Sequence, residues 1–211
     1  MLRRAFNPNG NATWFEAVSA LLNWLTNLTV ILTGAALIRE RARHAGTSDV
    51  LPVTPFEIAL SKVLANAIIV FAAFTASLLV VVRVMLEVPI AGSVPVFLTG
   101  TFLLVFATAA IGLMLDTIAR SMAQFAPLVI ITVLPMMILS DGMSPVKNPR
   151  DWLQQITWLL PSRHYLGFSK AVLFRGGGLD ITWPELCLVA ILGAGFLGLS
   201  LLGFRRAVAS G

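Results

Sequence analysis

The chain has 211 residues, of which 57% are apolar and only 12% are charged, and its formal net charge is +5. This composition lies outside the range of water-soluble domains and indicates a protein that crosses a membrane several times. A soluble helical bundle is disfavoured, because its helices would carry a charged face and the long apolar windows of this chain carry no charge.

Five apolar segments are long enough to be transmembrane helices, and they span about residues 17–38, 63–85, 94–116, 123–140 and 185–204. Each comes close to the roughly 20 residues that a helix needs to cross a hydrocarbon core of roughly 30 Å. Pro89, Gly92 and Pro95 delay the start of the third segment, and Pro127 and Pro135 interrupt the fourth. We therefore predict an all-α, polytopic integral membrane protein that forms a single transmembrane domain over residues 1–211.

The first predicted helix has a polar face at helical spacing, made by Asn23, Thr26, Asn27, Thr33 and Gly34. Four leucines cluster on the opposite side: Leu21, Leu25, Leu28 and Leu32. Because unsatisfied amides are costly in hydrocarbon, the polar face should point toward protein or water. Two interpretations stay open, namely hydrogen bonds between helices and the lining of a transport path.

Residues 39–57 form a predicted cytoplasmic loop that contains a basic cluster and a helix start. Thr54 can serve as N-cap, Pro55 as the first helical residue and Glu57 as the third, which is a capping box. A helix should therefore begin at Pro55 and continue into the second span. Basic residues are about equal in number on the two sides, so the orientation depends on Arg39 and Arg41, which adjoin the end of a span.

Residues 149–175 predict two short interfacial helices on the outer side, the second of them running from Tyr165 to Phe174 and ending at three glycines. Four aromatic side chains of this region suit a membrane interface: Trp152, Trp158, Tyr165 and Phe168. The run from Thr182 to Glu185 repeats the capping-box pattern and predicts the start of the last span.

Small residues at four-residue spacing indicate helix packing in two spans, at Thr108 and Gly112 and at Ala190, Ala194 and Gly198. Asp116 and Arg120 lie one turn apart, which predicts an ion pair. The single cysteine, Cys187, excludes a disulfide within the chain. No metal site is predicted, because His44 and His164 lack a grouping of cysteines or carboxylates with ligand spacing.

An intramembrane aspartyl protease would need two carboxylates close enough to share a proton. Asp116 and Asp141 are the candidate pair, and the predicted spans place them at opposite ends of the bilayer, roughly 30 Å apart. We therefore predict no catalytic residues and no enzymatic activity for this chain.

Several segments of the sequence resemble the permease subunit of type-2 ABC exporters, most closely the bacterial branch that exports drugs and other small molecules. The similar segments are residues 6–10, 33–41, 52–57, 88–95, 118–122, 173–176, 179–180 and 183–184. Family members carry an additional span and an external domain before the position of Phe6. The chain thus resembles the C-terminal five spans of a six-span permease, and a separate segment is expected to supply the missing span.

The resemblance implies a multi-pass protein of the bacterial inner membrane, in which two permease copies, identical or different, form the path. A separate ABC ATPase subunit would bind and hydrolyse ATP, since this chain has no G-x-x-x-x-G-K-[ST] phosphate loop and binds no cofactor of its own. Nucleic acid is not an expected partner. The expected alternative is a scaffold or an inactive permease fragment that transports nothing.

The resemblance also assigns a role to ten residues, which are expected to couple the chain to the ATPase: Arg39, Glu40, Arg41, His44, Gly46, Thr47, Pro52, Thr54, Pro55 and Glu57. The polar face of the first predicted helix, and not the resemblance, suggests four residues for the transport path: Asn23, Thr26, Asn27 and Thr33. The loop departs from the family pattern around Ala42, Arg43 and Ala45, and this puts the docking of the ATPase in question.

Overall fold

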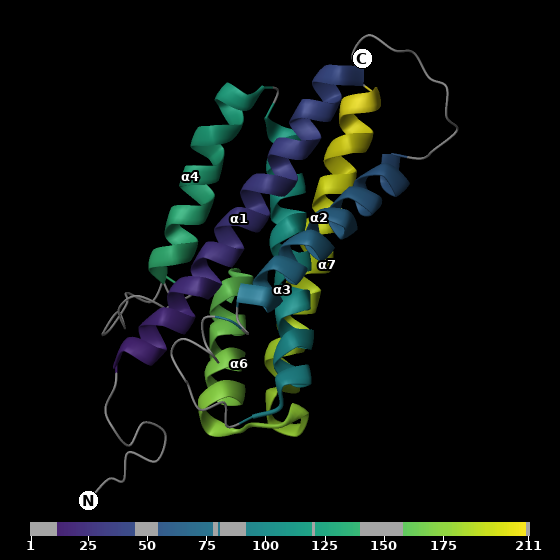
Figure 1. The fold of residues 1–211 in the computed structure, drawn as a ribbon. Coiled ribbons are helices and arrows are strands. Elements are labelled where there is room, and N and C mark those ends of the chain that lie inside the picture. The colour runs from purple at the N-terminus through teal and green to yellow at the C-terminus, as the bar shows by residue number, and fades with distance from the viewer. Residues whose placement is uncertain are drawn as a thin grey trace, which may run out of the picture.

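The computed structural model describes residues 12–44, 55–77, 80, 92–119, 121–139 and 158–209. Over these ranges the chain forms six helices and no strand (Figure 1): α1 (Ala12–His44), α2 (Pro55–Ser77), α3 (Val94–Ile118), α4 (Met122–Leu139), α6 (Pro161–Arg175) and α7 (Leu179–Ala209). The prediction of an all-helical membrane protein is thus confirmed.

Three of the described helices contain windows that are long and apolar enough to cross a membrane: Ser19–Arg39, Val94–Ile118 and Leu179–Gly203. Two shorter apolar stretches, Val63–Ser77 and Met122–Met137, belong to α2 and α4. All five correspond in position to the segments that the sequence predicts as spans.

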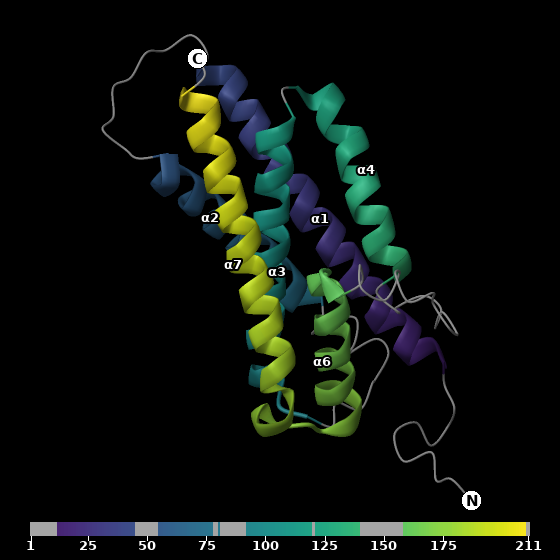
Figure 2. The ribbon, with the colours of Figure 1, turned by 180° about the vertical axis from the view of Figure 1, so that it is seen from behind.

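Helix α3 is the centre of the bundle, with α1, α2, α6 and α7 packed around it. Figures 1 and 2 show α3 and α7 running side by side along the long axis, with α1 crossing α3 obliquely. The C-terminal ends of these three helices and the N-terminal ends of α2 and α4 gather at the upper end in Figure 1. Helix α6 lies beside α3 and α7 at the lower end, so the two ends of the molecule are built from different elements.

Prolines and a glycine mark several helix ends where the sequence predicts them. Helix α2 begins at Pro55, and α3 begins at Val94 with Pro95 in its first turn. Helix α6 ends at Gly176, which adopts the left-handed conformation with φ 64°. The Gly177 N–H then donates to the Ala171 carbonyl 2.9 Å away, which satisfies a carbonyl that the helix end leaves open.

The prediction for the start of the last span is wrong, because α7 begins at Leu179 and not after a cap at Thr182. The carbonyl of Gly178 accepts from the backbone N–H of Ile181 (3.3 Å) and from that of Thr182 (3.2 Å), so the helix is already formed one turn earlier. The Thr182 hydroxyl donates to the same carbonyl at 2.9 Å. Glu185, the expected partner of the cap, bonds to another helix.

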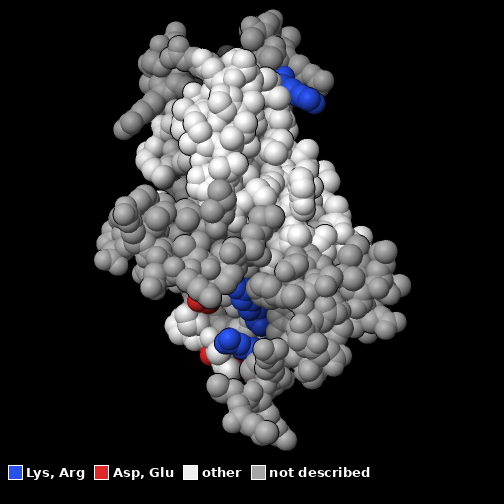
Figure 3. Space-filling view, turned by 90° about the vertical axis from the view of Figure 1, so that its left-hand side faces the viewer, with Lys and Arg blue, Asp and Glu red and all other residues white. Residues whose placement is uncertain are grey.

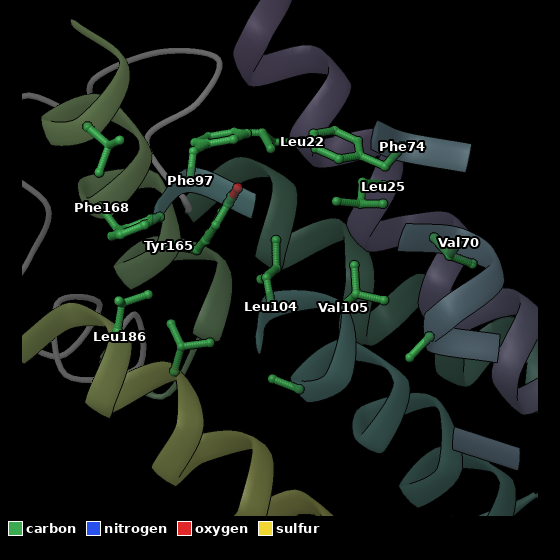
Figure 4. Packing of buried hydrophobic residues seen from close by; sticks show 14 of the residues in the cluster. Leu22, Leu25, Val70, Phe74, Phe97, Leu104, Val105, Tyr165, Phe168 and Leu186 are labelled. Carbon is green, nitrogen blue, oxygen red and sulfur yellow. The ribbon is translucent and has the colours of Figure 1, made fainter. Parts of the chain in front are cut away.

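A large hydrophobic core joins α1, α2, α3, α6 and α7 (Figure 4). Tyr165 and Phe168 lie in this core with no exposed surface, so the prediction that they face a membrane interface is wrong. Gly100 on α3 leaves the space that the Phe168 ring fills, because a Cβ at Gly100 would lie 2.2 Å from that ring. Trp158, in contrast, is 59% exposed.

The small residues of α3 pack as predicted, whereas those of α7 do not. Thr108 and Gly112 are fully buried. On α7 the side that meets α3 contains Gly193, whose added Cβ would lie 3.0 Å from Ala107. Ala194 is exposed, and a Cβ added at Gly198 would have no atom within 4 Å. The predicted stripe of small residues on α7 therefore lies beside the surface that contacts α3.

Charged side chains of the described residues occupy two levels of the surface (Figure 3). Arg39 is exposed and lies near the C-terminal end of α1. The group at the other level comes from α6 and the start of α7: Arg163, Lys170, Arg175, Asp180 and Glu185. The described residues between the two levels place no charge on the surface, as expected of a protein in contact with lipid tails.

Candidate functional site

The predicted polar face of α1 is buried inside the bundle. Exposed fractions are 4% for Asn23, 3% for Thr26, 7% for Asn27 and 0% for Thr33. The expectation that this face points toward protein is therefore confirmed within the single chain. That this polar face also lines a transport path stays a prediction.

The opposite side of α1 differs in part from the predicted leucine face. Leu28 and Leu32 are 48% and 47% exposed, and Trp24 is 63% exposed. Leu25 is only 4% exposed, because it packs in the large core together with Val70 and Phe74 of α2. The lipid-facing side is therefore rotated relative to the predicted one.

Two threonines of α1 satisfy their hydroxyls on their own helix. Thr26 donates to the Leu22 carbonyl at 3.0 Å, and Thr29 donates to the Leu25 carbonyl at 2.7 Å. Such bonds hide the polarity of a threonine within a helix. These hydroxyls therefore contribute little to the polarity of the interior.

Asn27 and Thr33 keep polar atoms open to the interior. The Asn27 amide nitrogen donates to the Met137 sulfur of α4 at 2.9 Å, and a thioether is a weak acceptor. The Asn27 Oδ1 and the Thr33 hydroxyl have no hydrogen-bond partner among the described residues. The space between α1 and α4, where the Asn27 amide lies, is therefore one place in the described interior with unused hydrogen-bonding capacity. The Thr33 side chain lies toward Gly112 of α3.

Helix α4 covers this space with one apolar face. Phe125, Val129, Val133 and Met136 are buried at helical spacing and pack against Val30 and its neighbours. The other side of α4 is exposed, with Ile131 at 69%. Figure 2 shows α4 at one side of the bundle, and the large core of α1, α2, α3, α6 and α7 contains no residue of α4.

Helices α1 and α3 cross at two glycines. A Cβ on Gly112 would lie 2.5 Å from the Val30 carbonyl oxygen, and one on Gly34 would lie 2.2 Å from the ring of Phe125. Glycines at such positions let helix backbones approach closely in a membrane protein. The crossing joins α1, α3 and α4 at one point and fixes the direction of the last turns of α1.

Most of the predicted coupling residues fall at the edge of the described structure or beyond it. Helix α1 continues through Arg39 to His44, so the first part of the predicted loop 39–57 is helical. The side chains of Glu40, Arg41, His44 and Glu57 lie outside the described part of the chain, as do Gly46, Thr47, Pro52 and Thr54 entirely. Asp116 has no exposed surface, and Arg120, its predicted partner, is also outside the described residues.

At the other end of the molecule, hydrogen bonds tie α6 to its neighbours. The Thr101 hydroxyl donates to the Phe97 carbonyl at 2.9 Å, so the Tyr165 hydroxyl donates to Thr101, 2.5 Å away. His164 lies 2.9 Å from Glu185 of α7. Sequence reasoning missed both contacts, because the partners of each pair are far apart along the chain.

Comparison with known proteins shows similarity along the whole chain. The family described as "ABC-2 family transporter protein" matches residues 2–202. The "Inner membrane transport permease YhhJ" of Escherichia coli (strain K12) is 40% identical over 209 residues, 98% of this chain and 55% of that protein. The chain thus spans about half the length of this relative.

Two further relatives from the same strain carry names of the same kind. The "Probable multidrug ABC transporter permease YbhR" is 29% identical over 213 residues, 99% of this chain and 56% of the relative. The "Probable multidrug ABC transporter permease YbhS" is 26% identical over 206 residues, 95% of this chain and 54% of the relative. All three similarities extend over nearly the full chain.

Proposed function

The chain belongs to the ABC-2 family of transporter proteins, and from this we propose that it is a membrane-spanning subunit of a bacterial exporter of small molecules. Two permease copies would form the path, and a separate ABC ATPase would supply the energy. The subunit would lie in the inner membrane. The match of the family to residues 2–202 is the single observation that carries this proposal.

The continuity of α1 supports a way of coupling ATP hydrolysis to transport. One uninterrupted helix, Ala12–His44, contains the buried polar face, the crossing at Gly34 and the exposed Arg39. Movement of a protein bound to residues 45–54 would tilt this rigid helix. Because the crossing with Gly112 acts as the pivot, the polar face on its far side would move against α4.

The unused Oδ1 of Asn27, whose amide nitrogen contacts Met137 of α4, supports a path between α1 and α4. Displacement of α4 would expose this amide to a passing molecule. Such a neutral group suits a substrate that is weakly polar and able to form hydrogen bonds.

Co-purification tests the ATPase partnership. The tagged chain is isolated from membranes of a bacterium that carries it, in its full natural form, and the ATP turnover of the preparation is measured. We expect an ATPase to accompany the wild-type chain. Replacement of residues 52–57 by a glycine and serine linker should remove it, whereas Asp180→Asn at the other end of the molecule should not.

A preparation that contains the chain but hydrolyses no ATP would favour the scaffold alternative. Equal loss of the ATPase in the Asp180→Asn control would show that the linker variant acts through misfolding, and the docking role of residues 52–57 would then be abandoned.

Substitutions in the polar face test the path. Asn23→Leu and Asn27→Leu are expected to change which dyes of a lipophilic panel are taken up by inverted vesicles in the presence of ATP. If both variants lower only the thermal stability and leave the range of dyes unchanged, the polar face is structural.

A further inference from the structure

His164 on α6 is held by oxygen atoms at both nitrogens of its ring. Its Nδ1 lies 2.9 Å from Glu185 Oε2 on α7, and its Nε2 lies 2.9 Å from the Trp158 carbonyl oxygen. The Trp158 ring packs edge-on against the imidazole, with centroids 5.6 Å apart and an interplanar angle of 65°. The ring orientation is therefore fixed by three contacts.

These contacts need one more hydrogen than a neutral His164 and an ionised Glu185 carry together. A carbonyl oxygen only accepts, so Nε2 must carry a hydrogen. A neutral histidine has no second hydrogen, and its bare Nδ1 would face the lone pairs of an ionised carboxylate at 2.9 Å. The observed geometry is favourable when a proton lies between Nδ1 and Glu185.

We propose that His164 and Glu185 form a proton-binding site that fastens α6 to α7. Because imidazole is a stronger base than a carboxylate, the proton is bound to the ring. The bound state is an imidazolium that donates one hydrogen bond to Glu185 and one to the Trp158 carbonyl. This site goes beyond the proposed transport function and does not depend on it.

The surroundings let solvent protons reach the pair from one side. The His164 side chain is 6% exposed, whereas that of Glu185 is 42% exposed. Gly167, one turn after His164, lies beside the carboxylate, since a Cβ there would be in ordinary contact with Glu185 Oε1 at 3.6 Å. The carboxylate thus bridges the buried ring and the solvent.

Other charged groups near the pair come from the same two helices. The Arg163 guanidinium lies over the Trp158 ring, 5.7 Å from its centroid, and Lys170 and Arg175 follow on α6. Helix α7 contributes Asp180 and the thiol of Cys187. Among the described side chains of α3, which also packs on α6, the charged one is Asp116 near the opposite end, and the described side chains of α4 carry no charge.

Loss of the proton should weaken the contact between α6 and α7. At higher pH the neutral ring keeps its bond to Trp158, and the Nδ1 lone pair then repels the carboxylate. Because the Glu185 carboxylate is 42% exposed, solvent screens the pair, and the hydrogen bond stabilises by about 0.2–1 kcal/mol, equivalent to at most roughly fivefold in an opening equilibrium. The contact is therefore tighter in acid and looser in alkali.

Nuclear magnetic resonance of the histidine ring tests the site directly. The full chain is labelled with ¹⁵N-histidine in nanodiscs, and His44→Gln leaves His164 as the single histidine. We expect hydrogens on both ring nitrogens at pH 6. Glu185→Gln is the matched variant: its amide donates to Nδ1, so the ring should be neutral, with a hydrogen on Nε2 alone.

Amide hydrogen exchange of residues 165–169, the first amides that can bond within α6, gives a second readout, corrected for the intrinsic effect of pH. We expect opening in the wild type to be up to roughly fivefold greater at pH 8.5 than at pH 6. Glu185→Gln and His164→Gln should show no such change. A neutral wild-type ring at pH 6, or the same pH dependence in wild type and variants, would overturn the proposal.

Discussion

The crossing of α1 and α3 predicts a large effect of a single added methyl group at Gly112. In Gly112→Ala the new Cβ would lie 2.5 Å from the Val30 carbonyl oxygen. Carbon and carbonyl oxygen atoms approach each other to about 3.3 Å, so the two backbones must separate by about 0.8 Å. Overpacking of this kind costs about 1–3 kcal/mol, and the contact with Phe125 would be disturbed as well.

Gly195→Ala and Gly198→Ala are the matched controls, because an added Cβ at either position meets no atom within 4 Å. All three variants receive the same gain of up to about 1 kcal/mol in helix propensity, so differences among them report the contact alone. Unfolding of the protein in mixed micelles by a denaturing detergent measures the free energies. Equal stability of Gly112→Ala and the two controls would refute the close crossing of α1 and α3.

Four further substitutions test other contacts. Tyr165→Phe removes a buried hydroxyl whose partner, Thr101, keeps its own bond to a carbonyl, so we expect a loss of about 1 kcal/mol in unfolding free energy; an unchanged stability would contradict this bond. Gly34→Ala should destabilise, and Phe125→Leu should restore part of the loss, because the added Cβ meets that ring; additive effects would argue against the contact. Ile131→Lys places a charge on the 69% exposed side of α4, which should lower insertion into membranes by about 2.5–3.5 kcal/mol. Normal insertion would show that this side does not face lipid.

Long apolar segments of the sequence predicted much of the fold. A membrane helix forms its backbone hydrogen bonds internally, and its side chains must be apolar where they meet lipid. All five expected spans correspond to helices, and the ends at Pro55, Val94 and Gly176 follow from local residues. The burial of Asn27 was predictable for a related reason, since an amide in hydrocarbon needs protein or water beside it.

Contacts between distant segments could not be predicted in the same way. Tyr165 and Phe168 were expected at an interface, and their contacts with Thr101 and Gly100 come from a helix far away in sequence. The start of α7 at Leu179 was missed because the Gly178 carbonyl accepts the first N–H groups without any side-chain cap. A helical pattern fixes which residues share a face but not which neighbour covers it.

The coupling role depends above all on the side of the membrane that residues 45–54 face. Cys187→Ala removes the natural cysteine, and Ala45→Cys or Asp180→Cys then places a single thiol at one end of the molecule. A membrane-impermeant maleimide is applied to intact cells and to inverted vesicles. We expect Ala45→Cys to be labelled only in inverted vesicles and Asp180→Cys only in intact cells; labelling of Ala45→Cys from outside intact cells would contradict the account.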